Sequence, residues 1–129
     1  LLEVEEERLR AAGLSRPKIA ALRDLAAKAT DGLVPGLEQL ARMADEEIVE
    51  RLCAVRGVGR WTVEMLLIFR LGRPDVLPVS DYGIRKGYSR MVGQQEPAAP
   101  TEIARYGERW RPFRTAASWY LWRALELVD

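Results

Sequence analysis

Two short segments combine residue types that could do chemistry. The first, Leu52–Thr62, holds Gly57 and Gly59 in a Gly-x-Gly turn between two helical patterns. Without Cβ atoms, both glycines could adopt positive φ and let a phosphate approach the N–H groups that open the second helix, where the helix dipole favours an anion. An ordinary helix connection would use the same residues. A helix that reads bases in the major groove is excluded, because Trp61–Leu71 is too apolar.

The second segment is Ser80-Asp81-Tyr82, which follows a loop rich in Pro and Gly at residues 72–79. Asp is a good helix N-cap, and this short segment taken alone predicts that Asp81 is the N-cap of the following helix. Asp75, in the loop, is the other carboxylate nearby, and we expect it to shape the loop. The loop contains too many helix-breaking Pro and Gly residues to be helical, and Pro78 argues against a strand.

The elements that must position these segments have helical periodicity almost throughout, which predicts an all-α fold: a compact bundle of about seven short helices. We expect Ser15 to cap one helix, Pro35-Gly36 to open a short one that includes Met43, and Asp45 to cap another. The apolar run Met65–Phe69 predicts a buried central helix. The remaining helices are expected over 80–92, over 101–110, and from Pro112 to Val128.

Length and composition bound the possibilities. The chain has 129 residues, of which 48% are apolar, and this predicts one domain over residues 1–129. Its net charge is +1, but residues 1–50 carry 7 basic and 11 acidic side chains and residues 51–129 carry 13 and 8. The second half is therefore the expected place for an anionic partner. The absence of histidine excludes a Ser-His-Asp triad and zinc sites that use imidazole.

The single cysteine and the hydropathy pattern bear on the cellular setting. Cys53 cannot form an internal disulfide, and we expect it to be a small buried residue in a reducing cytoplasm. No apolar run is long enough to span a bilayer, so no membrane partner is expected. The chain begins with Leu1 rather than Met, which suggests a piece of a longer protein.

The wider pattern closely resembles the helix-hairpin-helix-GPD superfamily of DNA glycosylases, and most of all its 3-methyladenine DNA glycosylase II branch. The resemblance covers roughly residues 15–128. It is carried by Leu52–Thr62, by Leu71-Gly72-Arg73-Pro74-Asp75, by Leu77-Pro78-Val79-Ser80-Asp81-Tyr82-Gly83-Ile84-Arg85, by Tyr106-Gly107-Glu108-Arg109-Trp110-Arg111-Pro112-Phe113-Arg114 and by Trp119-Tyr120-Leu121-Trp122.

The resemblance implies catalysis by Asp81. A carboxylate near C1′ of an extruded nucleotide can stabilise oxocarbenium charge and orient or deprotonate the attacking water. Bifunctional members carry a lysine just after the hairpin, where this chain has Trp61; the resemblance therefore implies a monofunctional enzyme that acts on damaged double-stranded DNA. Lys86, the nearest lysine, is expected to meet phosphate or solvent.

The resemblance also implies a base pocket and a DNA clamp. Trp61, Tyr82 and Trp122 match pocket positions, and aromatic rings suit the cationic ring of a purine such as 3-methyladenine or 7-methylguanine. Met65 stands where the branch has a further aromatic, which implies a differently shaped pocket. We expect Trp110, Phe113 and Trp119 to pack in the core. The clamp would comprise the hairpin amides of Gly57, Val58, Gly59, Arg60 and Thr62.

No cofactor is expected for the chemistry. In the family the hairpin commonly holds a monovalent cation, Na⁺ or K⁺, on backbone carbonyls, which by position would be those of Cys53, Val55 and Val58. Part of the family's pocket and its strand-opening wedge come from helices upstream of this segment. Two other functions stay open: a non-catalytic DNA-binding module that keeps only the hairpin, and a helical protein-interaction domain. The oligomeric state is not predicted. Side chains that could meet phosphate are Arg56, Arg60, Arg85, Lys86, Arg90, Arg111 and Arg114.

Overall fold

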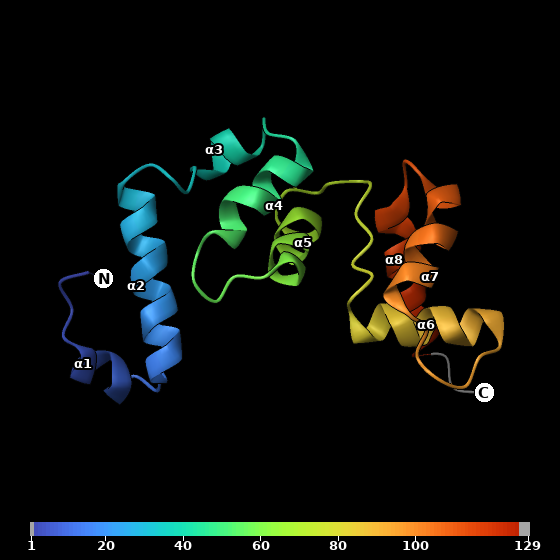
Figure 1. The fold of residues 1–129 in the computed structure, drawn as a ribbon, viewed down its shortest axis with the longest axis horizontal. Helices are drawn as coiled ribbons and strands as arrows, with labels where there is room; N and C mark the ends of the chain where they lie inside the picture. Colours follow the sequence, from blue (N-terminus) through green and yellow to red (C-terminus); the bar gives the residue numbers. More distant parts are fainter. Residues whose placement is uncertain (1, 127–129) are drawn as a thin grey trace. The chain divides into compact units, whose positions relative to one another are not determined.

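The computed structural model describes residues 2–126, and every regular element in them is a helix (Figure 1). The predicted all-α class is confirmed. An acidic segment near the start forms a further short helix. The elements are α1 (Glu6–Ala11), α2 (Arg16–Thr30), α3 (Leu37–Leu40), α4 (Asp45–Cys53), α5 (Arg60–Phe69), α6 (Tyr82–Val92), α7 (Pro100–Gly107), the 3₁₀ helix η1 (Glu108–Trp110) and α8 (Arg114–Ala124).

The chain divides into two compact units, Leu1–Val63 and Glu64–Asp129, with the boundary inside α5. We describe each unit by itself, and the single-domain organisation stays a prediction. The first unit contains the hairpin between α4 and α5. The second contains the loop with Asp75 and Asp81, followed by α6, α7 and α8. The two segments singled out in the sequence therefore belong to different units.

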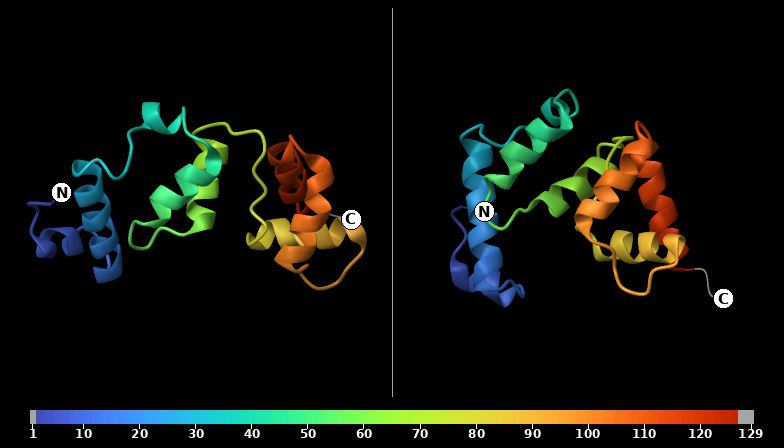
Figure 2. Two further views of the ribbon diagram at one scale, coloured as in Figure 1. Left: turned by 45° about the horizontal axis from the view of Figure 1, so that its top comes forward. Right: turned by 45° about the vertical axis from the view of Figure 1, so that its right-hand side comes forward.

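In the first unit, α2 is the longest helix and α1 packs beside it (Figure 2). Ser15 occupies the N-cap position of α2 as predicted, although its hydroxyl makes no capping hydrogen bond. The predicted helix from Pro35 to Met43 is shorter than expected. Gln39 accepts a hydrogen bond from the N–H of Gly36, and after Leu40 the chain tightens into bonds between residues three apart. The buried side chains of this unit include Ile19, Leu40, Ile48, Val49, Leu52 and Val55.

In the second unit, α6, α7 and α8 lie together in every view (Figures 1 and 2), and their side chains form one apolar core. The backbone of α8 comes so close to α6 that a Cβ on Gly87 would lie 2.0 Å from the carbonyl oxygen of Leu121. Glycine is therefore required at this crossing. The core residues are Leu77, Ile84, Tyr88, Ala98, Ile103 and Leu121.

The C-terminal helices differ from the prediction in their bounds. The helix expected over 101–110 changes to 3₁₀ geometry after Gly107. Pro112 lies before α8 rather than in its first turn, because the N–H of Phe113 still bonds to the carbonyl of Trp110 at 2.7 Å and closes a separate turn. The predicted end at Val128 lies outside the described residues.

Burial corrects three further expectations. Within the apolar run of α5, Leu67 and Ile68 are buried but Phe69 is 59% exposed, because a helix on one side of a unit buries one face only. Cys53 is exposed rather than buried, since it follows Leu52 around the helix and turns away from the core. Phe113 and Trp119 are exposed at 66% and 47%, whereas Trp110 packs against the core as expected.

Candidate functional site

The hairpin turn of the first unit is held by its own backbone. The N–H of Val58 donates to the carbonyl of Val55 at 3.1 Å, which makes Gly57 the third residue of a tight turn. Gly57 has φ +78°, as predicted, and this position favours glycine. Gly59 does not have positive φ, so the prediction for it is wrong. Its carbonyl accepts the N–H of Val63 and thereby begins α5.

Gly59 nevertheless leaves room for a ligand. A Cβ at Gly59 would meet no atom within 4 Å. The first turn of α5 comprises Arg60, Trp61 and Thr62, and the N–H groups of a helix's first turn point towards its N-terminal end. Val58, in contrast, uses its N–H inside the turn. This arrangement can present backbone donors to an anion at the start of α5.

Helix α2 supports the hairpin through a residue that the sequence did not single out. Asp24 accepts the N–H of Arg56 at 2.7 Å and an ammonium hydrogen of Lys28 at 2.6 Å. The Arg56 amide, with Lys28 adding to it, lowers the pKa of Asp24. A Cβ at Gly57 would lie 3.1 Å from the methyl group of Ala21. The sequence shows only that Asp24 and Lys28 are four residues apart, which allows them to pair on one face of a helix. The bond from Arg56 spans 32 residues, so the sequence does not reveal it.

In the second unit, Asp81 is both an N-cap and the partner of an aromatic side chain. Its Oδ1 accepts the N–H of Ile84 at 2.9 Å, as an N-cap does, and also the indole Nε1–H of Trp122 at 2.9 Å. These two bonds fix the carboxylate at the start of α6. The pairing of Asp81 with Trp122 joins two of the predicted site residues across 41 positions.

Gly83 makes this pairing possible. A Cβ there would lie 2.9 Å from Cδ1 of Trp122 and 3.0 Å from Oδ1 of Asp81. Together with Gly87, one turn later, it removes the side chains that would hold α8 away from α6. The two glycines thus serve the close approach of α8 to α6.

Trp122 belongs to a partly exposed aromatic cluster, which we define as Phe69, Trp119 and Trp122. The rings of Phe69 and Trp122 are stacked with centroids 6.0 Å apart, and Trp119 meets both edge-on at 5.5 and 5.8 Å. Phe69 and Trp119 were not predicted as site residues. Aromatic surface of this kind beside a carboxylate suits a flat cationic ligand.

The other predicted pocket residues lie as follows. Tyr82 is 61% exposed, and the ammonium of Lys86 lies 5.9 Å from its ring centroid. Met65 is half-buried and lies one turn after Trp61 in α5. Trp61 is 47% exposed and belongs to the first unit together with the clamp. Within the second unit, the structure brings Asp81 and Trp122 into contact.

Asp75 shapes the loop, as expected. Its carboxylate accepts hydrogen bonds from Arg114 at 2.6 and 3.0 Å and from Arg111 at 2.8 Å. The bond from Arg114, which outweighs the effect of burial, lowers the pKa of Asp75. Glu108 binds the same arginines, and Thr115 binds the backbone of Arg73 and Val76. The loop that leads to Asp81 is therefore fixed to the start of α8.

Comparison with known proteins agrees with this geometry. The model of a protein family described as "HhH-GPD superfamily base excision DNA repair protein" matches residues 1–112. The chain belongs to this superfamily. It is 44% identical over 129 residues to DNA-3-methyladenine glycosylase 1 of Schizosaccharomyces pombe, covering 98% of this chain and 56% of the relative. It is 29% identical over 123 residues to DNA-3-methyladenine glycosylase 2 of Escherichia coli, covering 95% and 40%.

A solved structure of the S. pombe 3-methyladenine DNA glycosylase in complex with abasic DNA matches with a TM-score of 0.91 and 42% identity. The match covers 99% of this chain and 62% of that one. The predicted family and its helix-hairpin-helix are thus confirmed. The chain spans a little over half the length of the S. pombe relative.

Several arginines of this superfamily member are engaged within the protein. Arg60 forms a two-point ion pair with Glu46, and Arg85 donates to the carbonyl of Ala98 at 2.8 Å. Arg111 and Arg114 are bound to Asp75 and Glu108. Their predicted contacts with phosphate would have to be made alongside these bonds. None of the helices in the described part of the chain has the length and apolar character that crossing a bilayer requires.

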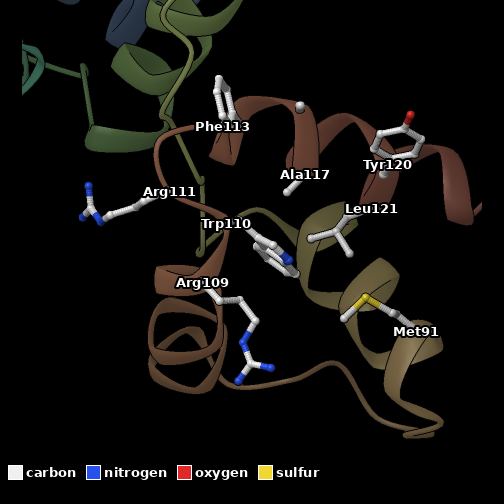
Figure 3. Close-up of a pocket in the computed structure, with 9 residues that line it drawn as sticks. Met91, Arg109, Trp110, Arg111, Phe113, Ala117, Tyr120 and Leu121 are labelled. Carbon is white, nitrogen blue, oxygen red and sulfur yellow. The ribbon is translucent and has the colours of Figure 1, made fainter.

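A groove of about 420 Å³ lies on the second unit, away from the predicted site residues (Figure 3). Trp110 and Leu121 contribute apolar side chains to its lining, which also includes Arg111. Neither Asp81 nor Trp122 lines the groove. Its rim includes Met91, Arg109, Phe113 and Tyr120.

The hairpin has backbone carbonyls of the kind that a monovalent cation takes as ligands. Cys53 is the last residue of α4, where helix carbonyls lack partners and the dipole is negative. The carbonyl of Val55 accepts one hydrogen bond, from Val58, and an oxygen of this kind has a second lone pair. Uncharged backbone oxygens are ligands that K⁺ accepts in proteins.

Proposed function

We propose that the protein acts in base excision DNA repair as a monofunctional DNA glycosylase. It hydrolyses the N-glycosidic bond of alkylated purines, such as 3-methyladenine and 7-methylguanine, in double-stranded DNA. The observation that carries this proposal is the carboxylate of Asp81, which Ile84 and Trp122 hold at the start of α6. The names of the S. pombe and E. coli relatives support the substrate class.

We assign the enzyme to the glycosylase II type. The support is the sequence pattern around Asp81 and in residues 106–122, described above. The S. pombe relative is named glycosylase 1, so the type is a narrower proposal than the activity.

In the proposed reaction the damaged nucleotide leaves the base stack, which places C1′ near Asp81. As the bond from C1′ to the purine nitrogen breaks, its electron pair goes to the base and positive charge develops on the sugar. The carboxylate stabilises that charge and takes a proton from water, whose oxygen bonds to C1′. The products are the free base and an abasic site.

The choice of substrate follows from charge. An alkylated purine is cationic, so it is a good leaving group and is attracted to aromatic faces. Trp122 presents such a face next to Asp81. The family resemblance further implies pocket roles for Tyr82, Trp61 and Met65. Water is the nucleophile, because Trp61 stands where bifunctional relatives have lysine.

The hairpin would bind the DNA backbone without reading its sequence. Its donors are the amides at the start of α5, with Gly57, Val58 and Gly59 shaping the turn. A Na⁺ or K⁺ ion on the carbonyls of Cys53, Val55 and Val58 would add positive charge beside the phosphate; no cofactor is needed for hydrolysis. We also propose that the enzyme works in the reducing cytoplasm, where Cys53 stays a thiol.

The test compares Asp81→Asn with wild type on methylated duplex DNA, with released bases measured by chromatography. Asparagine keeps an Oδ1 that can accept from Ile84 and Trp122 but loses the negative charge. We expect base release to fall by at least about a hundredfold while DNA affinity changes little. Asp31→Asn, at the exposed end of α2, is the matched control and should leave base release unchanged.

The measurement should be made on this chain and on the full natural protein. If the full wild-type protein binds duplex DNA but releases no base from any of several lesions, the protein is a DNA-binding module instead. If Asp81→Asn releases bases at the wild-type rate, Asp81 is only a helix cap.

A further inference from the structure

The first unit carries a basic cleft beside the hairpin. It has a volume of about 440 Å³ and lies between α1, α2 and the start of the hairpin turn. Arg16 and Arg23 lie two turns apart on α2, with Ile19 and Ala20 between them on the same face. Arg56, from the hairpin, completes the basic side. The remaining lining residues are Glu6 and Pro17.

Two contacts hold the walls of this cleft in place. Nη2 of Arg23 donates to the carbonyl of Val4 at 3.0 Å, so its guanidinium is fixed across 19 residues. The N–H of Arg56 donates to Asp24 at 2.7 Å, which fixes the backbone of Arg56 against α2. The cleft is therefore assembled by the same helix that supports the hairpin.

The charge of the cleft is strongly unbalanced. Three arginines line it and one acidic residue, Glu6, whose carboxylate lies 3.7 Å from Nε of Arg16. The side chain of Arg16 is 78% exposed, so this pair is a weak surface contact. Guanidinium groups match phosphate oxygens with paired N–H donors. The first turn of α2 adds the positive end of a helix dipole.

We propose that this cleft binds a backbone phosphate of the DNA strand that the hairpin clamps, one or two nucleotides away from the clamped phosphate. Arg56 connects the two sites, because it precedes Gly57 in the turn and lines the cleft. The inference rests on the proposed function in taking DNA as the partner. It adds Arg16 and Arg23 to the interface, in the half of the chain that carries net negative charge.

The test measures the affinity for undamaged duplex DNA at several salt concentrations, which does not require base release. The variants are Arg16→Gln, Arg56→Gln and the double variant, with Arg42→Gln as a control that is exposed and does not line the cleft. Each lost phosphate contact reduces the slope of log K against log salt by about 0.9. Because both arginines are proposed to contact one phosphate, we expect the double variant to reduce the slope by about 0.9, each single variant to reduce it by less, and the control to leave it unchanged.

An unchanged slope in the double variant would overturn the inference, and so would a wild type that does not bind DNA. Titration with inorganic phosphate is a further measurement. Variants that lose phosphate binding but keep the wild-type slope of log K against log salt for DNA would mean that the cleft binds a free anion. A failure of the proposed function would give a different set of results from a failure of the cleft proposal. The wild type would then release no base, while the slopes would still separate the cleft variants from the control.

Discussion

The hairpin and the Asp81 site use different kinds of atoms. The hairpin offers backbone amides. Its important positions are Gly57 and Gly59, where the lack of a side chain shapes the turn or leaves space for a ligand. The Asp81 site is built from side chains that meet across 41 residues and depends on the crossing of α6 and α8. A backbone site can be recognised from a short sequence, whereas a side-chain site needs the tertiary contact. The two sites should therefore respond differently to the same small change, a methyl group added to a glycine.

The largest effect is expected from Gly87→Ala. Its methyl group would be built 2.0 Å from the carbonyl oxygen of Leu121, so α6 and α8 must separate. Overpacking of this kind should lower the free energy of unfolding by about 3 kcal/mol or more, measured by urea denaturation. Gly36→Ala, where a Cβ meets nothing within 4 Å, is the control and should cost about 0.5 kcal/mol or less. Equal losses in the two variants would mean that the crossing is not tight.

Gly83→Ala should damage catalysis more than stability. The added methyl group would displace the indole of Trp122 from Asp81. Misplacement of a catalytic group by about 1 Å can cost about a hundredfold in rate, and we expect a loss of that order in single-turnover base release. The emission of the tryptophans should change with it. Full activity would show that the Trp122 bond does not position the carboxylate.

Gly59→Ala, in the hairpin, should lower DNA affinity and leave stability almost unchanged. The fold has space for the methyl group and φ is not positive, so thermal stability should stay close to wild type. A phosphate, however, could no longer approach the amides at the start of α5. We expect DNA affinity to fall about tenfold, the loss of one hydrogen bond to a charged group. Unchanged affinity would remove Gly59 from the clamp.

The smallest effect concerns pH. The bond from Arg114 lowers the pKa of Asp75 in the folded protein, so this residue contributes stability above its unfolded pKa of about 4, and the contribution is lost as pH falls through the folded value. Asp75→Asn should therefore flatten the fall in stability below about pH 4. Urea denaturation at pH 3 to 6 measures this. Asp24 in α2, which supports the hairpin, should behave in the same way, because the Arg56 amide lowers its pKa.

Local pattern was enough for much of the molecule. Periodicity gave α2, α4, α5 and α6 within a few residues, although the N-cap of α4 is Ala44 rather than the predicted Asp45. Gly57 was placed correctly in a turn with positive φ. The segment around Asp81 marked an N-cap, which the structure confirms. These features depend on residues close together in the chain, where backbone conformation and hydrogen bonding are decided locally.

Long-range contacts decided the rest. Nothing near Asp81 in the sequence indicates that Trp122 bonds to it, that Gly83 makes room for the indole, or that Phe69 and Trp119 stand beside it. Exposure of Cys53 and Phe69 was also missed, because one apolar pattern cannot tell which side of a helix meets a partner. The basic cleft arises in the acidic half, since folding brings Arg56 to α2. The sequence by itself determined the helices, the turn and the family; only the tertiary structure decided which side chains share a site, because that depends on helix packing between distant residues.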